Sequence, residues 1–258
     1  MVLFFSFCCD TISLDKSFPY DMDHERIEYM RIVFVRHGHP DYVNDCLTEL
    51  GRQQAIACAE KMVYEGIDLI FSSTCGRAME TAEFTAKRLG IRVIPEDFMR
   101  EVKWGEIDES SVLVDNGHPW NTAQVLSEDS DFGLMSFDWR DHKYFSGNKV
   151  TSCVDFVGDS FSKWLTQFGL RFCENGKIYC ANPCDDTVAV FSHGGSGAAM
   201  LSKLFNLPFP YVCLTYNMNF TSITVVDIPS KQDSFVAPRL ARLNDDRHVN
   251  NKIITFQM

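Results

Sequence analysis

The sequence predicts an α/β fold in which a doubly wound, mainly parallel sheet carries helices on its faces. Short runs of β-branched and aromatic residues alternate with segments whose apolar residues recur at helical spacing. Two of the helical segments are followed by a glycine, the usual residue beyond a helix C-terminus. Strands that alternate with helices of this length are typical of parallel sheets.

The first part of the sheet is predicted between residues 31 and 94. Arg31–Val35 is almost entirely β-branched or aromatic and ends at a polar break, as a buried strand does. Thr48 is placed to cap a helix, because apolar residues follow it at helical spacing as far as Gly66. The other elements expected here are a strand at 68–71, a helix at 76–89 stopped by Gly90, and a strand at 91–94 ended by Pro95.

The stretch from 105 to 160 breaks this alternation. It contains eleven Asp and Glu residues against three Lys and Arg residues, and Trp120 and Trp139 lie within it. We expect an insertion that caps one end of the sheet and has no separate core. The elements expected after it are a helix at 152–172 with an apolar stripe through Phe156, Phe161, Trp164, Leu165 and Phe168, a strand at 187–191, a helix ending near Leu204, and an antiparallel edge pair at 223–226 and 239–243.

Residues 1–29 have a composition of their own, with a short apolar start followed by an acidic run. Met30 directly precedes the first predicted strand. We therefore expect translation to begin at Met30 or Met22, with the upstream part a dispensable tail and residues 30–258 the folded domain.

The composition limits the partners and the compartment. The formal net charge is −11 and the isoelectric point is about 5.0, which argues against nucleic acid or an anionic membrane as a partner. The ten cysteines form neither a disulfide framework nor a zinc-ligand pattern, so reduced thiols in the cytoplasm are the simplest account. The apolar start lacks the features of a signal peptide, and no stretch approaches the ~20 apolar residues of a membrane-spanning helix.

Two predicted strands end in the same way. The residues at these ends are Arg36-His37-Gly38 and Ser192-His193-Gly194. Arg77 lies just beyond the second strand and Glu101 beyond the third. Since ligands bind outside the carboxyl ends of the strands in open α/β sheets, we expect these side chains to meet at one edge. Two arginines and two histidines around one point form an anion site, and phosphate is its natural ligand.

This pattern resembles the histidine phosphatase superfamily, also called the phosphoglycerate-mutase-like family. The matching pieces are Arg36-His37-Gly38, the segment Leu47-Thr-Glu-Leu-Gly-Arg-Gln-Gln-Ala55, Ser72-Ser73 with Arg77-Ala78 and Thr81-Ala82, Glu101, and Ser192-His193-Gly194. The resemblance extends from about residue 31 to the C-terminus. It implies a three-layer α/β/α sandwich with an inserted cap, no metal or other cofactor, and a small phosphorylated molecule as substrate.

The resemblance also implies roles for these residues. His37 would be the nucleophile that forms a phosphohistidine, so its attacking nitrogen must carry a free electron pair. The phosphoryl oxygens would be bound by Arg36, Arg77, His193 and the backbone N–H groups around Gly194. Glu101 would protonate the leaving oxygen and then deprotonate the attacking water. The implied activity is metal-independent hydrolysis of a phosphomonoester.

The loop after the nucleophile departs from the family pattern. Members often have an Asn here that contacts the phosphoryl group, and Asn44 is the candidate in a loop that does not match cleanly. His39, Pro40 and Asp41 differ from the residues of true mutases, which favours hydrolysis. The acidic balance of the cap favours small substrates of modest negative charge. The cap residues that are candidates to line the substrate mouth are His118 and His142.

Three alternative functions stay open. A phosphoglycerate mutase would pass the phosphoryl group to a second substrate hydroxyl instead of water. A catalytically silent relative would bind a phosphorylated ligand or a partner protein, although such relatives usually lack a nucleophile or an arginine that is present here. Cys46 and Arg52 have the Cys-x5-Arg spacing of cysteine phosphatases, but Glu49 would place a carboxylate against the phosphate.

Overall fold

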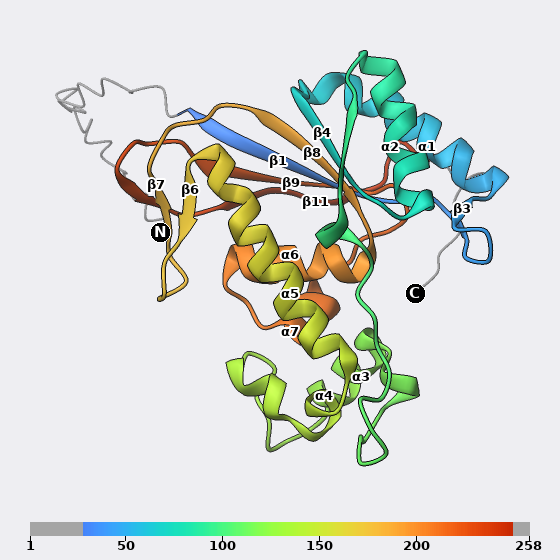
Figure 1. Cartoon of the computed structure of the whole chain (residues 1–258), viewed down its shortest axis with the longest axis vertical. Helices are drawn as coiled ribbons and strands as arrows, with labels where there is room; N and C mark the ends of the chain where they lie inside the picture. The colour runs from blue at the N-terminus through green and yellow to red at the C-terminus, as the bar shows by residue number, and fades with distance from the viewer. Residues whose placement is uncertain (1–27, 250–258) are drawn as a thin grey trace, which may run out of the picture.

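The computed structural model describes residues 28–249, and its centre is a six-stranded sheet (Figure 1). The strand order is β11 (Arg239–Asp245), β9 (Ile223–Pro229), β1 (Tyr29–Arg36), β8 (Thr187–Ser192), β4 (Leu69–Ser73) and β5 (Val93–Glu96). β1, β8, β4 and β5 are parallel neighbours, whereas β9 is antiparallel to both β1 and β11. The mainly parallel sheet and its antiparallel edge pair are therefore confirmed. The predicted tail, apart from residues 28 and 29, lies outside the described residues.

Alternation along β1 produces the three layers. Successive side chains of a strand point to opposite faces. Ile32 and Phe34 join the core on the face covered by α5 (Lys149–Trp164) and α6 (Gly194–Phe205), while Val33 and Val35 join the core under the two helices of the other face. Those two helices are α1 (Glu49–Met62) and α2 (Gly76–Leu89), as Figure 1 shows. The predicted α/β/α sandwich is confirmed.

The ends of α1 and α2 follow the predicted signals. The Thr48 side chain accepts a hydrogen bond from the N–H of Gly51, so it caps α1 as expected. Gly66 and Gly90 adopt φ values of 68° and 73°, in the left-handed region that glycine enters without strain. A 3-10 turn at Val63–Glu65 separates α1 from Gly66, whereas α2 ends directly at Gly90.

The helix predicted at 152–172 is shorter and lies earlier. α5 ends at Trp164, and a 3-10 turn at Leu165–Phe168 leads to Gly169 (φ 75°). The chain then forms β6 (Leu170–Phe172), which pairs with β7 (Ile178–Cys180) and β10 (Ser234–Val236) in a separate small sheet. Phe156, predicted in the apolar stripe, is 62% exposed, because the buried face of α5 runs through Val154, Val157 and Phe161 instead.

Pro95 does not end the third strand, contrary to expectation. β5 continues through it to Glu96. This strand lies at the edge of the sheet and pairs only with β4 among the described strands. A proline is tolerated there, since an edge strand leaves half of its N–H groups without a ladder partner in any case.

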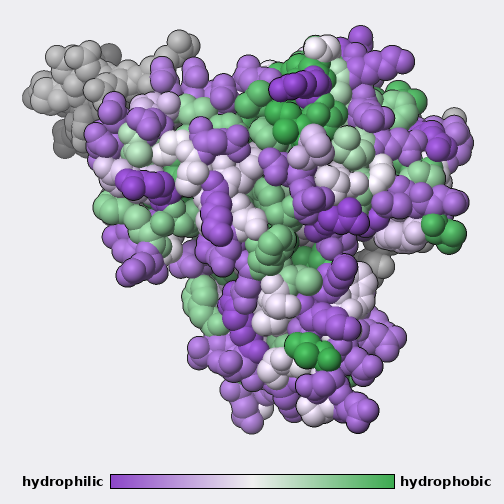
Figure 2. All heavy atoms as spheres, viewed as in Figure 1, coloured by the Kyte–Doolittle hydropathy of each residue, from purple (hydrophilic) through white to green (hydrophobic). Residues whose placement is uncertain are grey.

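The cap lies beyond one end of the sheet, at the bottom of Figure 1. It contains α3 (Pro119–Ser127) and α4 (Lys143–Ser146), with 3-10 turns at Asp115–Gly117 and Phe137–Asp141. Trp139 and Phe145 are fully buried, and α3 packs against α7 (Phe209–Thr215) of the main domain. The apolar side chains of the cap thus extend the main core, while its visible face in Figure 2 is mostly hydrophilic.

The remaining elements are β2 (Pro40–Asp41), β3 (Cys46–Leu47) and a 3-10 turn at Asp97–Met99. β2 and β3 form a short hairpin between β1 and α1. Among residues 28–249, the helices are too short or too polar to cross a lipid bilayer.

Candidate active site

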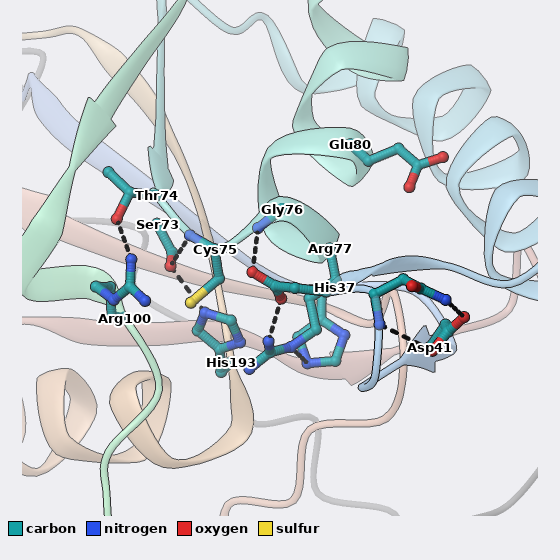
Figure 3. A network of polar contacts seen from close by, with 12 residues as sticks. His37, Asp41, Ser73, Thr74, Cys75, Gly76, Arg77, Glu80, Arg100 and His193 are labelled. Atoms are coloured by element: carbon teal, nitrogen blue, oxygen red, sulfur yellow. Dashed lines mark hydrogen bonds and ion pairs between the residues drawn. The ribbon is translucent and has the colours of Figure 1, made fainter.

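The carboxyl ends of three adjacent parallel strands bring the predicted residues together. β1 is followed by His37, β8 by His193, and β4 by the turn into α2 that carries Arg77. The rings of His37 and His193 meet edge to face, with centroids 5.0 Å apart. Figure 3 shows these two imidazoles grouped with Arg77. The expectation that the strand ends converge is therefore met in the structure.

The orientation of the His37 ring leaves one nitrogen free. Its Nδ1 lies 2.7 Å from the carbonyl oxygen of Gly38, and a carbonyl can only accept, so Nδ1 carries the hydrogen. The electron pair of the neutral ring is then on Nε2. Burial, reinforced by the charges of Arg36 and Arg77, holds the pKa of His37 well below its usual range, so the ring is neutral at physiological pH.

The loop that carries His37 is held between α1 and α2. The N–H of Gly38 donates to the Thr81 hydroxyl at 3.1 Å. The N–H of His39 donates to the Gln54 side chain at 2.8 Å. A Cβ on Gly38 would lie 2.6 Å from the carbonyl oxygen of Gly51, so this close approach requires glycine. The segment 47–55 thus matters for the site because it packs against the nucleophile loop.

His193 keeps one nitrogen unpaired. Its Nε2 lies 2.8 Å from the Ser73 hydroxyl, which also accepts from the N–H of Cys75. Its Nδ1 is buried and has no hydrogen-bond partner among residues 28–249. Burial and the neighbouring His37 lower the pKa of His193 well below its usual range. When the Ser73 hydroxyl donates to Nε2, Nδ1 of the neutral ring carries the hydrogen. A buried donor without a partner is costly, so a ligand oxygen is a suitable acceptor for Nδ1–H.

Two guanidinium groups flank the imidazoles. Arg36 donates from Nη1 to the Met218 carbonyl at 2.6 Å and stacks on the Phe220 ring at 4.2 Å, while its buried Nε has no partner in the described residues. Arg77 directs its Nε to Nε2 of His37 at 3.4 Å. Burial lowers the pKa of Arg36. Together the two arginines place positive charge beside His37, and Arg77 donates toward the electron pair on its Nε2.

Glu101 lies at the N-terminus of α6, the helix that directly follows His193. Its Oε1 accepts from the N–H groups of Val102 and Ser196, at 3.0 and 3.1 Å. A Cβ on Gly195 would lie 2.6 Å from the same oxygen. Burial raises the pKa of Glu101, although Arg36 and these two N–H groups oppose the shift. A carboxyl group with a raised pKa can hold the proton that an acid catalyst must deliver.

Comparison with known proteins gives this arrangement a family. The model of the histidine phosphatase superfamily (branch 1) matches residues 32–134. Over 184 residues the chain is 33% identical to phosphoglycerate mutase-like protein 4 of Arabidopsis thaliana, a match that covers 67% of this chain and 70% of that protein. The chain belongs to the histidine phosphatase superfamily.

Two further matches cover a larger share of this chain. The chain is 26% identical over 236 residues to glucosyl-3-phosphoglycerate phosphatase of Mycobacterium tuberculosis, covering 87% of this chain and 98% of that one. A solved structure of a mycobacterial glucosyl-3-phosphoglycerate phosphatase aligns with a TM-score of 0.56 at 24% identity, over 83% of this chain and 98% of the other. The structural match shows the same fold.

Asp45 is a polar residue at the site that sequence reasoning missed. Its Oδ1 pairs with Nη1 of Arg77 at 2.5 Å, and its Oδ2 accepts from the N–H of Gly76 at 2.8 Å. Cys75, at the N-cap position of α2, provides no side-chain cap, so Asp45 caps the helix in its place. These bonds lower the pKa of Asp45 against the effect of its partial burial. No local pattern reveals the pair, because its members are 32 residues apart.

We expect the substitution Asp45→Asn to lower the kcat/KM of this protein by about tenfold to a hundredfold. The amide oxygen can still accept from Gly76, but the charge that orients Arg77 is lost, and a misplaced guanidinium stabilises the transition state poorly. Steady-state kinetics on one phosphomonoester measure the effect. The matched control is Glu60→Gln, which removes an exposed carboxylate paired with Arg88, another arginine of α2. Equal kcat/KM values for both variants would contradict a positioning role of Asp45.

The two other predicted ligands lie in different surroundings. Gly194 is the first residue of α6, and a Cβ there would lie 3.0 Å from Cη2 of Trp120 and 3.8 Å from Cζ of Arg36. Asn44 is exposed, and its side chain donates to Asp41 at 2.8 Å. Its contact with a phosphoryl group stays a prediction. No cluster of three or more His, Cys, Asp or Glu side chains within 28–249 is arranged to hold a metal ion.

Proposed function

We propose that this protein is a phosphatase that hydrolyses a small phosphomonoester through a phosphohistidine at His37. The observation that carries the proposal is the tautomer of His37, whose Nδ1–H bonds to the Gly38 carbonyl at 2.7 Å and leaves the electron pair on Nε2. The Nε of Arg77 lies on that side of the ring. A phosphoryl group bound by the two arginines would therefore lie against the attacking nitrogen.

In the first half-reaction the Nε2 electron pair of His37 forms a bond to phosphorus. The bond between phosphorus and the ester oxygen breaks, and the leaving oxygen takes the proton of Glu101. Charge in such a loose transition state spreads over the equatorial phosphoryl oxygens. Arg36, Arg77 and His193 would stabilise it, because Nε of Arg77 lies beside Nε2 of His37, and Nε of Arg36 and Nδ1 of His193 have no other partner in the described residues.

In the second half-reaction water attacks the phosphohistidine. Glu101, now ionised, takes a proton from the attacking water as its oxygen bonds to phosphorus. The nitrogen–phosphorus bond breaks, the electron pair returns to Nε2 of His37, and inorganic phosphate leaves. Because Glu101 regains its proton, the site is ready for another cycle.

The comparisons support hydrolysis of small phosphorylated molecules. The M. tuberculosis relative that matches most of this chain is a phosphatase. The test is to incubate the purified protein, without added metal, with para-nitrophenyl phosphate and with a panel of sugar phosphates and phosphoglycerates. Release of inorganic phosphate is expected. Interconversion of phosphoglycerates without release would indicate a mutase, and binding without turnover would indicate a silent relative.

The pH dependence follows from the directions of the pKa shifts. We expect kcat/KM to fall by about tenfold per pH unit above the raised pKa of Glu101, because the acid is then ionised in the free protein. Loss of activity through protonation of His37 is expected only well below pH 6.5, since its pKa is lowered. The measurement is kcat/KM across a pH series. In Glu101→Gln the alkaline limb due to this residue should disappear, and an unchanged limb would exclude Glu101 as the acid.

A further inference from the structure

Three aromatic rings stand side by side at the mouth of the site. The His118 ring lies between those of Trp104 and Trp120, with ring centroids at 5.3 and 5.7 Å. Trp104 is 38% exposed and Trp120 is partly exposed, so this row of rings, the aromatic wall, is accessible from solvent. Trp120 begins α3 of the cap, whereas Trp104 belongs to the loop that leads into the cap.

The aromatic wall begins directly beside the phosphate pocket. Cη2 of Trp120 comes within 3.0 Å of the Cβ position of Gly194, and the guanidinium carbon of Arg36 within 3.8 Å of the same position. The next residue, Gly195, lies against the carboxyl oxygen of Glu101. Trp120 and Glu101 therefore flank the same short backbone segment at the start of α6.

This placement puts the leaving group against the wall. A general acid must lie within hydrogen-bond reach, about 3 Å, of the oxygen it protonates. The alcohol attached to that oxygen would then lie next to Glu101. Trp120 approaches Gly194 on the same backbone segment, and the His118 ring lies beside Trp120.

The three rings of the aromatic wall present an uncharged surface to a ligand. Indole rings are uncharged, and partial burial lowers the pKa of His118, which favours its neutral form. Aromatic faces bind other rings and the apolar faces of sugars by stacking, and they bury apolar area. An anionic alcohol would gain nothing from these three rings.

We propose that the aromatic wall binds the leaving group and makes the site selective for phosphomonoesters whose alcohol carries a ring with an apolar face. The inference rests on the proposed function, because it assigns the alcohol half of the same substrate. Trp120 is the specificity residue nearest the reacting atoms, and Trp104 extends the surface outward.

The test compares benzyl phosphate with propyl phosphate. Both release a primary alcohol of similar acidity, so their ratio of kcat/KM reports the binding of the ring and not the chemistry of departure. We expect the wild-type protein to prefer benzyl phosphate by about tenfold, of which a specific aromatic contact accounts for roughly two- to tenfold. Trp120→Ala should bring the ratio close to one, and Trp104→Ala should lower it by about half or more.

Controls separate the possible causes. Phe156→Ala removes a 62% exposed ring on α5 and should leave the ratio unchanged. Orthovanadate, which fills only the phosphate pocket, should inhibit Trp104→Ala as strongly as it inhibits the wild-type protein. An unchanged inhibition constant shows that the phosphate pocket of the variant is intact. Trp120→Phe keeps a ring and should keep part of the preference, which guards against a cap that misfolds in Trp120→Ala.

The outcomes distinguish the two proposals. If the wild-type protein releases phosphate neither from these two esters nor from the substrate panel above, the proposed function fails. If it hydrolyses members of the panel but not benzyl phosphate, phosphatase activity stands and the selectivity of the wall is overturned. If it hydrolyses both esters with equal kcat/KM, phosphatase activity stands and the selectivity of the wall is overturned. The same conclusion follows if Trp104→Ala and Trp120→Phe lower kcat/KM for the two esters by the same factor.

Discussion

Replacement of His37 by alanine is expected to abolish formation of the covalent intermediate and to lower kcat by at least about 10³-fold. The variant keeps both arginines and Glu101, so it can still bind a phosphorylated substrate. The variant lacks the electron pair on Nε2 that attacks phosphorus. Water would have to attack the substrate directly, so one difficult displacement would replace the two easier ones that pass through the phosphohistidine.

The measurement is a rapid acid-free quench of protein mixed with a substrate labelled in its phosphoryl group. The wild-type protein should carry the label on His37, in a bond that is stable to base and labile to acid, whereas His37→Ala should carry none. Cys46→Ser is the control for the Cys-x5-Arg alternative and should keep both label and turnover. Label on a thiol or on an aspartate would exclude the proposed mechanism.

Replacement of Glu101 by glutamine is expected to have an effect that depends on the leaving group. With an alkyl phosphate, we expect kcat/KM, which reports the first half-reaction, to fall by about 10²- to 10⁴-fold, since the departing alkoxide needs the proton that glutamine cannot supply. With para-nitrophenyl phosphate the loss should be much smaller, because nitrophenolate leaves without protonation. The amide oxygen can still accept from Val102 and Ser196, so the geometry is kept.

Kinetics with both substrates on the same protein preparation test this expectation. Glu106→Gln is the matched control, because Glu106 is an exposed carboxylate in the same loop, five residues along the chain from Glu101. It should leave both rates within about twofold of wild type. An equal loss for the two substrates in Glu101→Gln would show that Glu101 acts through structure and is not the acid.

Both predictions depend on one electrostatic feature of the site. Burial favours the uncharged forms of His37, His193 and Glu101, while the two arginines remain cationic. The site therefore carries positive charge that a dianionic phosphoryl group can neutralise. Neutral imidazole and protonated carboxyl are also the states that attack and acid catalysis require. In the proposed mechanism, burial of the site thus favours the required protonation states of His37 and Glu101 together.

Much of this arrangement could be predicted from the sequence because its signals are local. The bounds of α2, the N-cap of α1 and the C-terminal glycine of α2 follow from residues adjacent to the helices themselves. The convergence of His37 and His193 follows from a general property of parallel sheets, which bring the carboxyl ends of their strands to one edge. Two local signals did not hold in the tertiary structure: β5 continues through Pro95, and α5 ends earlier than its apolar residues suggested.

The sequence by itself determined the strand-and-helix order, the parallel sheet and the residues that gather at its edge, since periodicity and strand ends are written over a few consecutive positions. Only the tertiary structure decided that Asp45 holds Arg77 and that Trp120 closes over Gly194. These partners are separated by tens of residues, and each pairing exists only because the hairpin and the cap pack where they do. Side-chain contacts of this kind depend on packing, and no local pattern specifies them.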